Sequence, residues 1–144
     1  MFDVTIATSN HEREDAFSVR RKVFVEEQGV PQNLELDELD KTADHFVVYS
    51  TGTPIGAGRI RETTAGIGKV ERVCILPEFR GQHLGNLIMH ALEKHAAHKE
   101  LQKIILNAQA YAVPFYEKLG YTVTSPEFMD GDIPHRAMEK KIIK

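Results

Sequence analysis

Residues 73–86 read Val-Cys-Ile-Leu-Pro-Glu-Phe-Arg-Gly-Gln-His-Leu-Gly-Asn, and this stretch decides the fold. Its apolar start predicts a strand, which a short turn of small and polar residues joins to an amphipathic helix. The first turn of a helix presents amides without intrahelical partners and a partial positive charge, which favour a phosphate or pyrophosphate. Gly81 allows the turn to tighten. Gly85 costs roughly 1 kcal/mol relative to alanine in a helix, and either close approach of a ligand or close helix–sheet packing would explain it.

The helix after this turn is the clearest amphipathic pattern in the chain. Its apolar residues recur at helical spacing: Leu84, Leu87, Ile88, Ala91, Leu92 and Ala96. In the strand before the turn, Lys69 to Leu76, the alternation slips, because Val70 lies on one parity and Val73 and Ile75 lie on the other. One inserted residue near Glu71 and Arg72 would produce that slip, so we predict a β-bulge there.

Shorter elements are predicted on both sides of this strand and helix. A capping box at Ser9 to Glu12 starts a first helix that runs to about Gln28, and the acidic segment Asn33 to Asp44 is read as a loop with one helical turn. Gly66 and Gly68 mark a hairpin. The other predicted elements are strands at Phe2–Ile6, His45–Ser50, Pro54–Arg61, Lys103–Ala108, Tyr121–Thr124 and Arg136–Ile143, and a short helix at Pro114–Leu119. A mixed sheet with helices on both faces, an α/β (α+β) fold, is the natural packing of this order.

Length and composition narrow the class of protein. The 144 residues suit one domain, 1–144, and their 42% apolar and 27% charged content is ordinary for a globular chain. A net charge of −3 disfavours nucleic-acid binding, which usually needs a basic surface. No membrane-spanning run or signal peptide is visible. A single cysteine, Cys74, forms no internal disulfide, which together with the other observations predicts a cytoplasmic protein.

The sequence motifs disfavour nucleotide binding by two common folds, metal binding and cysteine catalysis. No G-x-x-x-x-G-K-[ST] or G-x-G-x-x-G motif occurs, which disfavours a P-loop NTPase and a dinucleotide-binding Rossmann domain. His90, His95 and His98 share one helix, but no cysteine or obvious third ligand lies near, so no metal site is predicted. The strand position of Cys74 indicates a buried thiol rather than a nucleophile.

Two motifs resemble those of the GNAT superfamily of acyl-CoA-dependent N-acetyltransferases. The signature [QR]-x-x-G-x-[GA] reads Arg80-Gly81-Gln82-His83-Leu84-Gly85, with His83 where glycine is usual, and the hallmark F-Y-x-x-x-G-[FY] reads Phe115 to Tyr121. Further stretches are similar to the ElaA/YjcF-like branch: Val19–Gln28, Asn107–Ala110 and Gly131–His135. The resemblance implies a GNAT fold, a mixed and mostly antiparallel sheet whose two central strands splay at a β-bulge.

The resemblance also implies a site for acetyl-CoA, without a metal. Pantetheine would insert between the splayed strands and bond backbone groups of residues 73–75, as in strand addition. Asn107 would lie at the mouth of the splayed strands. The residues implied for the cosubstrate are Val73, Cys74, Ile75, Arg80, Gly81, Gln82, His83, Leu84, Gly85, Asn86, Asn107 and Tyr116.

Acetyl transfer to an amine needs a base and a proton donor for the departing thiolate. By its place in the second hallmark, Tyr116 resembles the general acid of the superfamily. Glu71, at the inferred bulge, is the first candidate for the base, with Glu27 and His45 as alternatives. Arg20 and Glu27 are seven residues apart on the first helix, which predicts one helical face. Arg20, Glu27, His45 and a loop residue, His135, are the candidates for the acceptor pocket.

The sequence is therefore identified as a member of an N-acetyltransferase superfamily acting on a primary amine, either of a small molecule or of a protein. The alternative is a non-catalytic acyl-CoA-binding sensor or scaffold with the same fold. No nucleic acid or membrane partner is expected, and the resemblance leaves a homodimer open.

Overall fold

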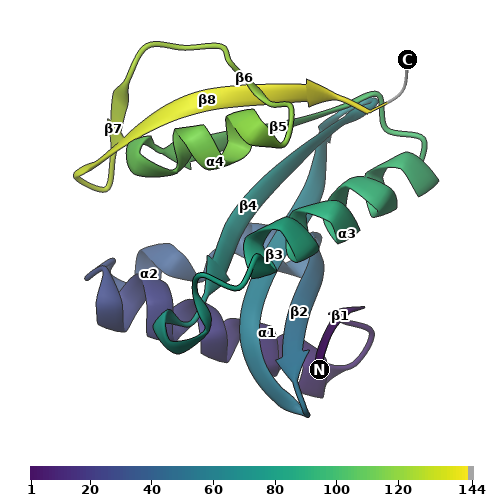
Figure 1. Cartoon of the computed structure of the whole chain (residues 1–144), viewed down its shortest axis with the longest axis vertical. Coiled ribbons are helices and arrows are strands. Elements are labelled where there is room, and N and C mark those ends of the chain that lie inside the picture. Colours follow the sequence, from purple (N-terminus) through teal and green to yellow (C-terminus); the bar gives the residue numbers. More distant parts are fainter. Residues whose placement is uncertain (143–144) are drawn as a thin grey trace. The chain divides into compact units, whose positions relative to one another are not determined.

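The computed structural model describes residues 1–142, and its chain divides into two compact units (Figure 1). The first unit contains residues 1–61 and 72–92, and the second contains residues 62–71 and the chain from residue 93 onward. The strands are hydrogen-bonded in the order β1-β2-β3-β4-β5-β8-β6, and β7 pairs with β8. Strands β4 and β5 are parallel, whereas the other pairs with a described register are antiparallel. The predicted mixed, mostly antiparallel sheet with helices is confirmed.

The elements follow one another as short strands and helices. The strands are β1 (Phe2–Ile6), β2 (Asp44–Ser50), β3 (Thr53–Thr64), β4 (Ile67–Ile75), β5 (Lys103–Gln109), β6 (Thr122–Val123), β7 (Phe128–Asp130) and β8 (Ile133–Lys141). The α-helices are α1 (Asn10–Arg20), α2 (Gln32–Glu35), α3 (Leu84–His98) and α4 (Val113–Lys118). The 3₁₀ turns are η2 (Glu38–Lys41), η3 (Pro77–Phe79) and η4 (Ala110–Ala112), and η1 (Arg21–Glu27) is a π-helix.

The first helix begins where the sequence predicts. The Glu12 amide donates to Ser9 Oγ at 3.2 Å, and Glu12 Oε1 accepts from the Thr8 amide at 2.8 Å, one residue before the position that a strict capping box uses. The helix continues from α1 into the π-helix η1 and ends before Gly29, whose φ of 76° is the left-handed conformation that favours glycine.

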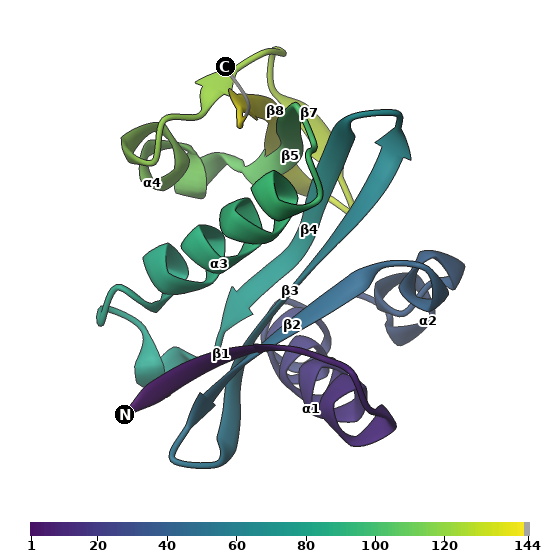
Figure 2. The same cartoon turned by 90° about the vertical axis from the view of Figure 1, so that its right-hand side faces the viewer.

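In the first unit, helices cover both faces of β2 and β3 (Figure 2). Successive strand residues point to opposite faces. A β-carbon added at Gly58 would lie 3.2 Å from Ile88 of α3, so this face packs on α3. The neighbouring Arg59 and its register partner His45 point to the other face, where the His45 ring lies edge-on to Phe17 of α1. The core between these layers is apolar, and it includes Val19, Val23, Phe46, Val47, Val48, Ile55, Ala57, Ile88, Met89 and Leu92.

The second unit is built around β5. Its parallel pairs with β4 run from Ile67–Lys103 to Val70–Leu106, and its antiparallel pairs with β8 continue to Gln109–His135. Arg72, two residues beyond the last of these β4 pairs, has a φ of 60°. A left-handed residue interrupts the pleat of a strand, so β4 is irregular where the parity slip predicted a bulge.

Several local predictions are corrected. The segment Asn33 to Asp44 contains two turns, α2 and η2, and buries Glu35 and Asp40. Leu87 is 38% exposed rather than part of the core, and Gly68 lies inside β4 rather than in the hairpin turn. Strand β7 was not predicted. Strand β8 begins at Ile133, before the predicted start, and the predicted end at Ile143 lies outside the described residues.

Within residues 1–142, the structure has no helix with the length and apolar content to cross a membrane.

Candidate functional site

The loop between η3 and α3 carries the signature residues of the first unit. Gly81 has a φ of 84° and His83 a φ of 61°, and both residues are exposed together with Gln82. A β-carbon added at Gly81 would meet nothing within 4 Å, so the loop surface is open there. Helix α3 begins directly after His83. The amides in the first turn of a helix have no hydrogen-bond acceptor within the helix. The loop and the helix start therefore present backbone donors to solvent.

His83 occupies a conformation that costs a residue with a β-carbon about 1 kcal/mol or more. We expect His83→Gly to raise the free energy of unfolding by about 0.5–1 kcal/mol, because relief of that strain exceeds the added entropy of the unfolded chain. Urea denaturation measures the change. Gln82→Gly is the control, since Gln82 has no left-handed strain to relieve and glycine there should destabilise. Equal effects of the two variants would contradict this explanation.

Arg80, the first residue of the signature, is joined to the end of the first helix. Its Nη1 and Nη2 donate to the two carboxylate oxygens of Glu27, both at 2.7 Å, and its Nε donates to the Ile75 carbonyl at 3.0 Å. The hydrogen bonds from Arg80 hold the pKa of the Glu27 carboxyl below its usual range. Two residues predicted for different subsites, the cosubstrate and the acceptor, thus form one bidentate pair that braces the loop.

The prediction that Arg20 and Glu27 share one helical face is wrong. The helix changes from α to π at Arg21, and the wider i→i+5 spacing rotates the later residues relative to an α-helix. Arg20 is 1% exposed, whereas the side chain of Glu27, beyond the change of pitch, is 37% exposed. Both charges are paired, Arg20 with Glu35 and Asp40 and Glu27 with Arg80. For the buried Arg20, an unpaired charge would be strongly unfavourable.

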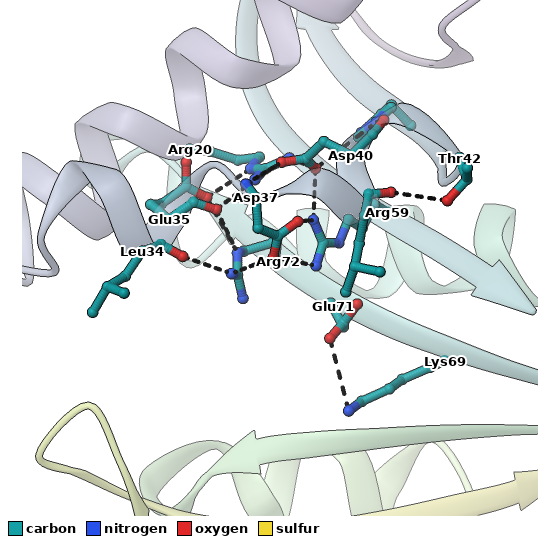
Figure 3. Close-up of polar contacts among 12 residues, drawn as sticks. Arg20, Leu34, Glu35, Asp37, Asp40, Thr42, Arg59, Lys69, Glu71 and Arg72 are labelled. Carbon is teal, nitrogen blue, oxygen red and sulfur yellow. Dashed lines mark hydrogen bonds and ion pairs between the residues drawn. The ribbon is translucent and has the colours of Figure 1, made fainter. Parts of the chain in front are cut away.

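A charge cluster of six residues, four of them buried, occupies the face of β2 and β3 that carries Arg59 (Figure 3). Arg20 donates to Glu35 and Asp40, both at 2.7 Å, and Arg59 donates to Asp40 at 2.6 Å. Further pairs add two residues at the outer edge of the cluster. The charge cluster comprises Arg20, Arg59 and Arg72 with Glu35, Asp37 and Asp40.

The charge cluster favours the ionised forms of Asp37 and Asp40. Burial alone would raise the pKa of Asp40, but hydrogen bonds from Arg20 and from the Asp37 amide, with the positive charge of Arg20, hold that pKa far below its usual range. The pKa of Asp37 is also lowered, since its pair with Arg59 outweighs the effect of burial. Three positive and three negative groups therefore compensate one another inside the first unit.

His45, predicted as a base or an acceptor contact, belongs to the edge of this cluster. It is 3% exposed, and its Nε2 lies 2.8 Å from the Asp40 carbonyl oxygen. Its Nδ1 is buried with no hydrogen-bond partner among the described residues. Burial lowers the pKa of the imidazole, which favours the neutral ring. A buried neutral histidine is placed to pack against Phe17 rather than to meet an acceptor in solution.

The end of β4 is positioned by the first unit as well. The Leu76 amide donates to the Ile55 carbonyl at 2.8 Å, which ties the strand end to β3. Cys74 is buried, and burial raises the pKa of its thiol to about 12. This confirms the reading of Cys74 as a core thiol, since a thiolate nucleophile needs a lowered pKa. Val73 and Ile75, on either side, are half-buried.

In the second unit, Tyr116 lies within an aromatic group. Its ring is edge-on to Phe115 at 4.9 Å and to Tyr121 at 5.8 Å between centroids, and the residue is half-buried on α4. Tyr121 is anchored in turn, because its hydroxyl donates to Glu93 at 2.9 Å. Asn107 is exposed on β5. These contacts fix the Tyr116 ring against the unit that carries it.

Glu71 and His135 also lie in the second unit. The Glu71 carboxylate is 3.8 Å from Lys69 Nζ, and its side chain is 15% exposed. His135 is not in a loop, as predicted, but in β8, where it pairs with Phe128 of β7 and stacks on its ring with centroids 6.0 Å apart. The turn before it has two left-handed residues, which makes a tight type I′ hairpin and extends the strand to His135.

Within residues 1–142, no three or more His, Cys, Asp or Glu side chains are arranged so that they could hold a metal ion. His95 and His98 lie on the last turns of α3, as the sequence places them.

Sequence reasoning missed the charge cluster, apart from Arg20. Its acidic members Glu35, Asp37 and Asp40 were read as part of a weakly patterned loop. A signal was present at Arg59, since it interrupts the apolar, buried stretch of residues 55–60, and a charge in such a position needs a partner. The acidic partners of Arg20 and Arg59 lie 15 to 22 residues away in sequence, so no local pattern identifies them.

Comparisons of sequence and of structure with known proteins point to the same family. Residues 7–142 match the family model described as an acetyltransferase (GNAT) domain. YjcF of Bacillus subtilis (strain 168), named an uncharacterized N-acetyltransferase, is 50% identical over 136 residues, which cover 94% of this chain and 96% of that protein. ElaA of Escherichia coli (strain K12) is 27% identical over 88% of this chain and 85% of that protein. A crystal structure of an acyl-CoA N-acyltransferase from Pseudomonas aeruginosa superposes with a TM-score of 0.86 at 25% identity, covering 97% of this chain and 99% of that one.

Proposed function

Because this chain belongs to the GNAT acetyltransferase family, where it groups with the YjcF and ElaA proteins, we propose that it transfers an acetyl group from acetyl-CoA to a primary amine. The observation that carries this proposal is the exposed loop before α3, where Gly81 and His83 turn the backbone ahead of the first-turn amides. Backbone donors at a helix start suit the negatively charged pyrophosphate of acetyl-CoA.

The cosubstrate would be held mainly by backbone groups. Residues 81–86 would bind the pyrophosphate, and the strand end 73–75 would bond the pantetheine amides, one of its amides also polarising the thioester carbonyl. Cys74 would contribute its backbone alone, since its thiol is buried and protonated. Arg80 braces the loop through Glu27 and Ile75, and Asn107 is assigned to the cosubstrate by the family pattern.

The transfer itself requires two proton movements. The amine nitrogen attacks the thioester carbonyl carbon, so that the C–N bond forms and the C–S bond breaks. Glu71, directly or through a water, would take the proton that the ammonium must lose, since an alkylammonium is charged at neutral pH. The Tyr116 hydroxyl would give a proton to the departing thiolate. Acetyl-CoA supplies the activated acyl group, and no redox step or metal is involved in this scheme.

The acceptor is proposed only as a class, a primary amine. Arg20 and His45 are buried within or beside the charge cluster, and the proposal does not assign them to the acceptor. Glu27 stays a candidate contact for a cationic amine, since its side chain is 37% exposed, and the amine would share the carboxylate with Arg80. His135 is buried in β8, with its Nδ1 2.7 Å from the Ile133 carbonyl oxygen, and it stays a candidate acceptor contact.

Acetyl-CoA binding provides the first test. At a ligand concentration a hundredfold above Kd, the free energy of unfolding should rise by about 2.7 kcal/mol. Gly85→Val should abolish this rise, because a branched side chain would meet the pyrophosphate at the first turn of α3. Ala97→Val is the control, since it adds a branched residue at an exposed position far along the same helix. Thermal shift and titration calorimetry measure both effects.

A folded Gly85→Val variant with unchanged affinity would contradict the assigned pyrophosphate site. Turnover is a separate question, which a panel of small-molecule and peptide amines addresses by mass-spectrometric detection of acetylated product. Binding of acetyl-CoA without acetylation of any amine would contradict the enzymatic function.

A further inference from the structure

Arg72 adopts a backbone conformation that its residue type disfavours. Its φ of 60° places it in the left-handed region, within a strand, and it carries a full side chain where glycine would be unstrained. Such strain costs a residue with a β-carbon about 1–2 kcal/mol and persists only where the surroundings hold it. The contacts of the Arg72 side chain identify what holds it.

The Arg72 guanidinium is bound to one short segment, residues 34–37. Its Nε donates to the Glu35 carbonyl at 3.2 Å and lies 3.3 Å from Glu35 Oε2. Its Nη2 donates to the Leu34 carbonyl at 3.3 Å and to Asp37 Oδ2 at 3.4 Å. Figure 3 shows Leu34, Glu35 and Asp37 around Arg72. The side chain is 26% exposed, so it lies at the outer edge of the charge cluster.

The segment that holds Arg72 is itself anchored in the core of the first unit. Glu35 accepts from Arg20 of α1 at 2.7 Å, and Asp37 accepts from Arg59 of β3 at 2.8 Å and 3.1 Å. Arg20 and Arg59 are no more than 1% exposed, and both donate to Asp40. Movement of residues 34–37 would therefore leave buried charges without partners, which is strongly unfavourable.

We propose that Arg72 is a positioning residue, through which the charge cluster imposes the left-handed turn in β4 and so orients the backbone of Val73, Cys74 and Ile75. This inference rests on the proposed function, which assigns that backbone to pantetheine. A strand that ran straight through position 72 would point the backbone donors and acceptors of the following residues to the opposite edge of the strand. The charge cluster then serves acetyl-CoA binding without touching it.

Two substitutions at Arg72 separate backbone positioning from simple stabilisation. Arg72→Gly and Arg72→Ala both remove the guanidinium, but glycine adopts a φ of 60° freely and alanine does not. When binding requires a disfavoured conformation, the apparent affinity falls by the fraction of molecules that hold it. We expect Arg72→Gly to bind acetyl-CoA within about threefold of the wild type, and Arg72→Ala to bind roughly 5- to 30-fold more weakly than Arg72→Gly.

Calorimetric titration measures the three dissociation constants, and NMR of the ligand-free proteins measures the backbone coupling constant at position 72. The wild type and Arg72→Gly should retain a positive φ, whereas Arg72→Ala should lose it. Should Arg72→Ala not fold, Arg72→Met presents the same β-carbon on a longer apolar side chain. Equal affinities of the glycine and alanine variants, or a positive φ in both, would overturn the inference.

The two measurements also separate this inference from the proposed function. A wild-type protein that binds no acetyl-CoA contradicts the proposed function and with it the ligand-binding half of the inference. The coupling constants still decide whether the charge cluster imposes the backbone conformation at Arg72, since they need no ligand.

Discussion

Replacement of Tyr116 by phenylalanine is expected to lower turnover roughly 10²- to 10⁴-fold, the usual contribution of a proton donor in the transition state. The substitution removes the hydroxyl and keeps the ring, whose edge-on contacts with Phe115 and Tyr121 hold it in the second unit. Folding and acetyl-CoA affinity should therefore stay close to the wild-type values. Steady-state kinetics on a confirmed amine, with calorimetry for acetyl-CoA, measure both quantities.

The matched control for this prediction is Tyr111→Phe. Tyr111 is 78% exposed, so loss of its hydroxyl should change neither turnover nor stability. Because a thiolate is a good leaving group, acetyl transfer can be faster than product release, and the loss of a proton donor would then not lower turnover. The measurement must therefore establish that acetyl transfer limits the rate. Full turnover of Tyr116→Phe under that condition would remove the hydroxyl from the mechanism and leave water as the proton donor.

The largest loss of stability is expected when a member of the charge cluster is replaced. Arg20→Met removes the cation that pairs with Glu35 and Asp40 and leaves two buried carboxylates without their main partner. Loss of one member of a buried ion pair costs about 3–5 kcal/mol, which is a large part of the stability of a domain. Urea denaturation at neutral pH measures the change in free energy of unfolding.

Arg80→Met is the control, because its pair with Glu27 is nearly half exposed and should contribute no more than about 1 kcal/mol. The pH dependence gives a second measure. Because the folded-state pKa of Asp40 is lowered, the cluster stabilises the fold above the unfolded-state pKa of about 3.9 and loses that contribution as the pH falls. The difference between the wild type and Arg20→Met should therefore shrink below about pH 4. A difference that is small at neutral pH, or constant with pH, would contradict the role assigned to the cluster.

The parts of the molecule that could be predicted from the sequence are those with local patterns. The amphipathic period of α3, the glycine signature before it and the parity slip in β4 each involve neighbouring residues, and each indicated its element correctly. The left-handed φ of His83 explains why glycine is usual at that position. From the sequence alone, His83 could be recognised only as a departure from the family signature.

The remaining features depend on contacts between distant residues or on small changes of helical pitch. Nothing in the sequence of residues 21–27 distinguishes a π-helix from an α-helix, so Arg20 and Glu27 were placed on one face. The acidic residues at 35, 37 and 40 follow no period, and their partners come from α1, β3 and β4. Strand β7 has three residues, too short for an alternation to be read, and without it His135 could not be assigned to a strand.

The composition of the charge cluster has a kinetic consequence. Its members come from α1, α2, η2, β3 and β4, and its ion pairs join residues 15 or more positions apart in the chain. Because such contacts need the separate segments to assemble first, we expect them to form after the folding transition state, so that Arg20→Met should have a φ-value near zero. Interactions absent from the transition state slow unfolding without accelerating folding. The arginines and carboxylates of the first unit therefore act mainly on the lifetime of the native state, and so on how often this chain opens to a protease.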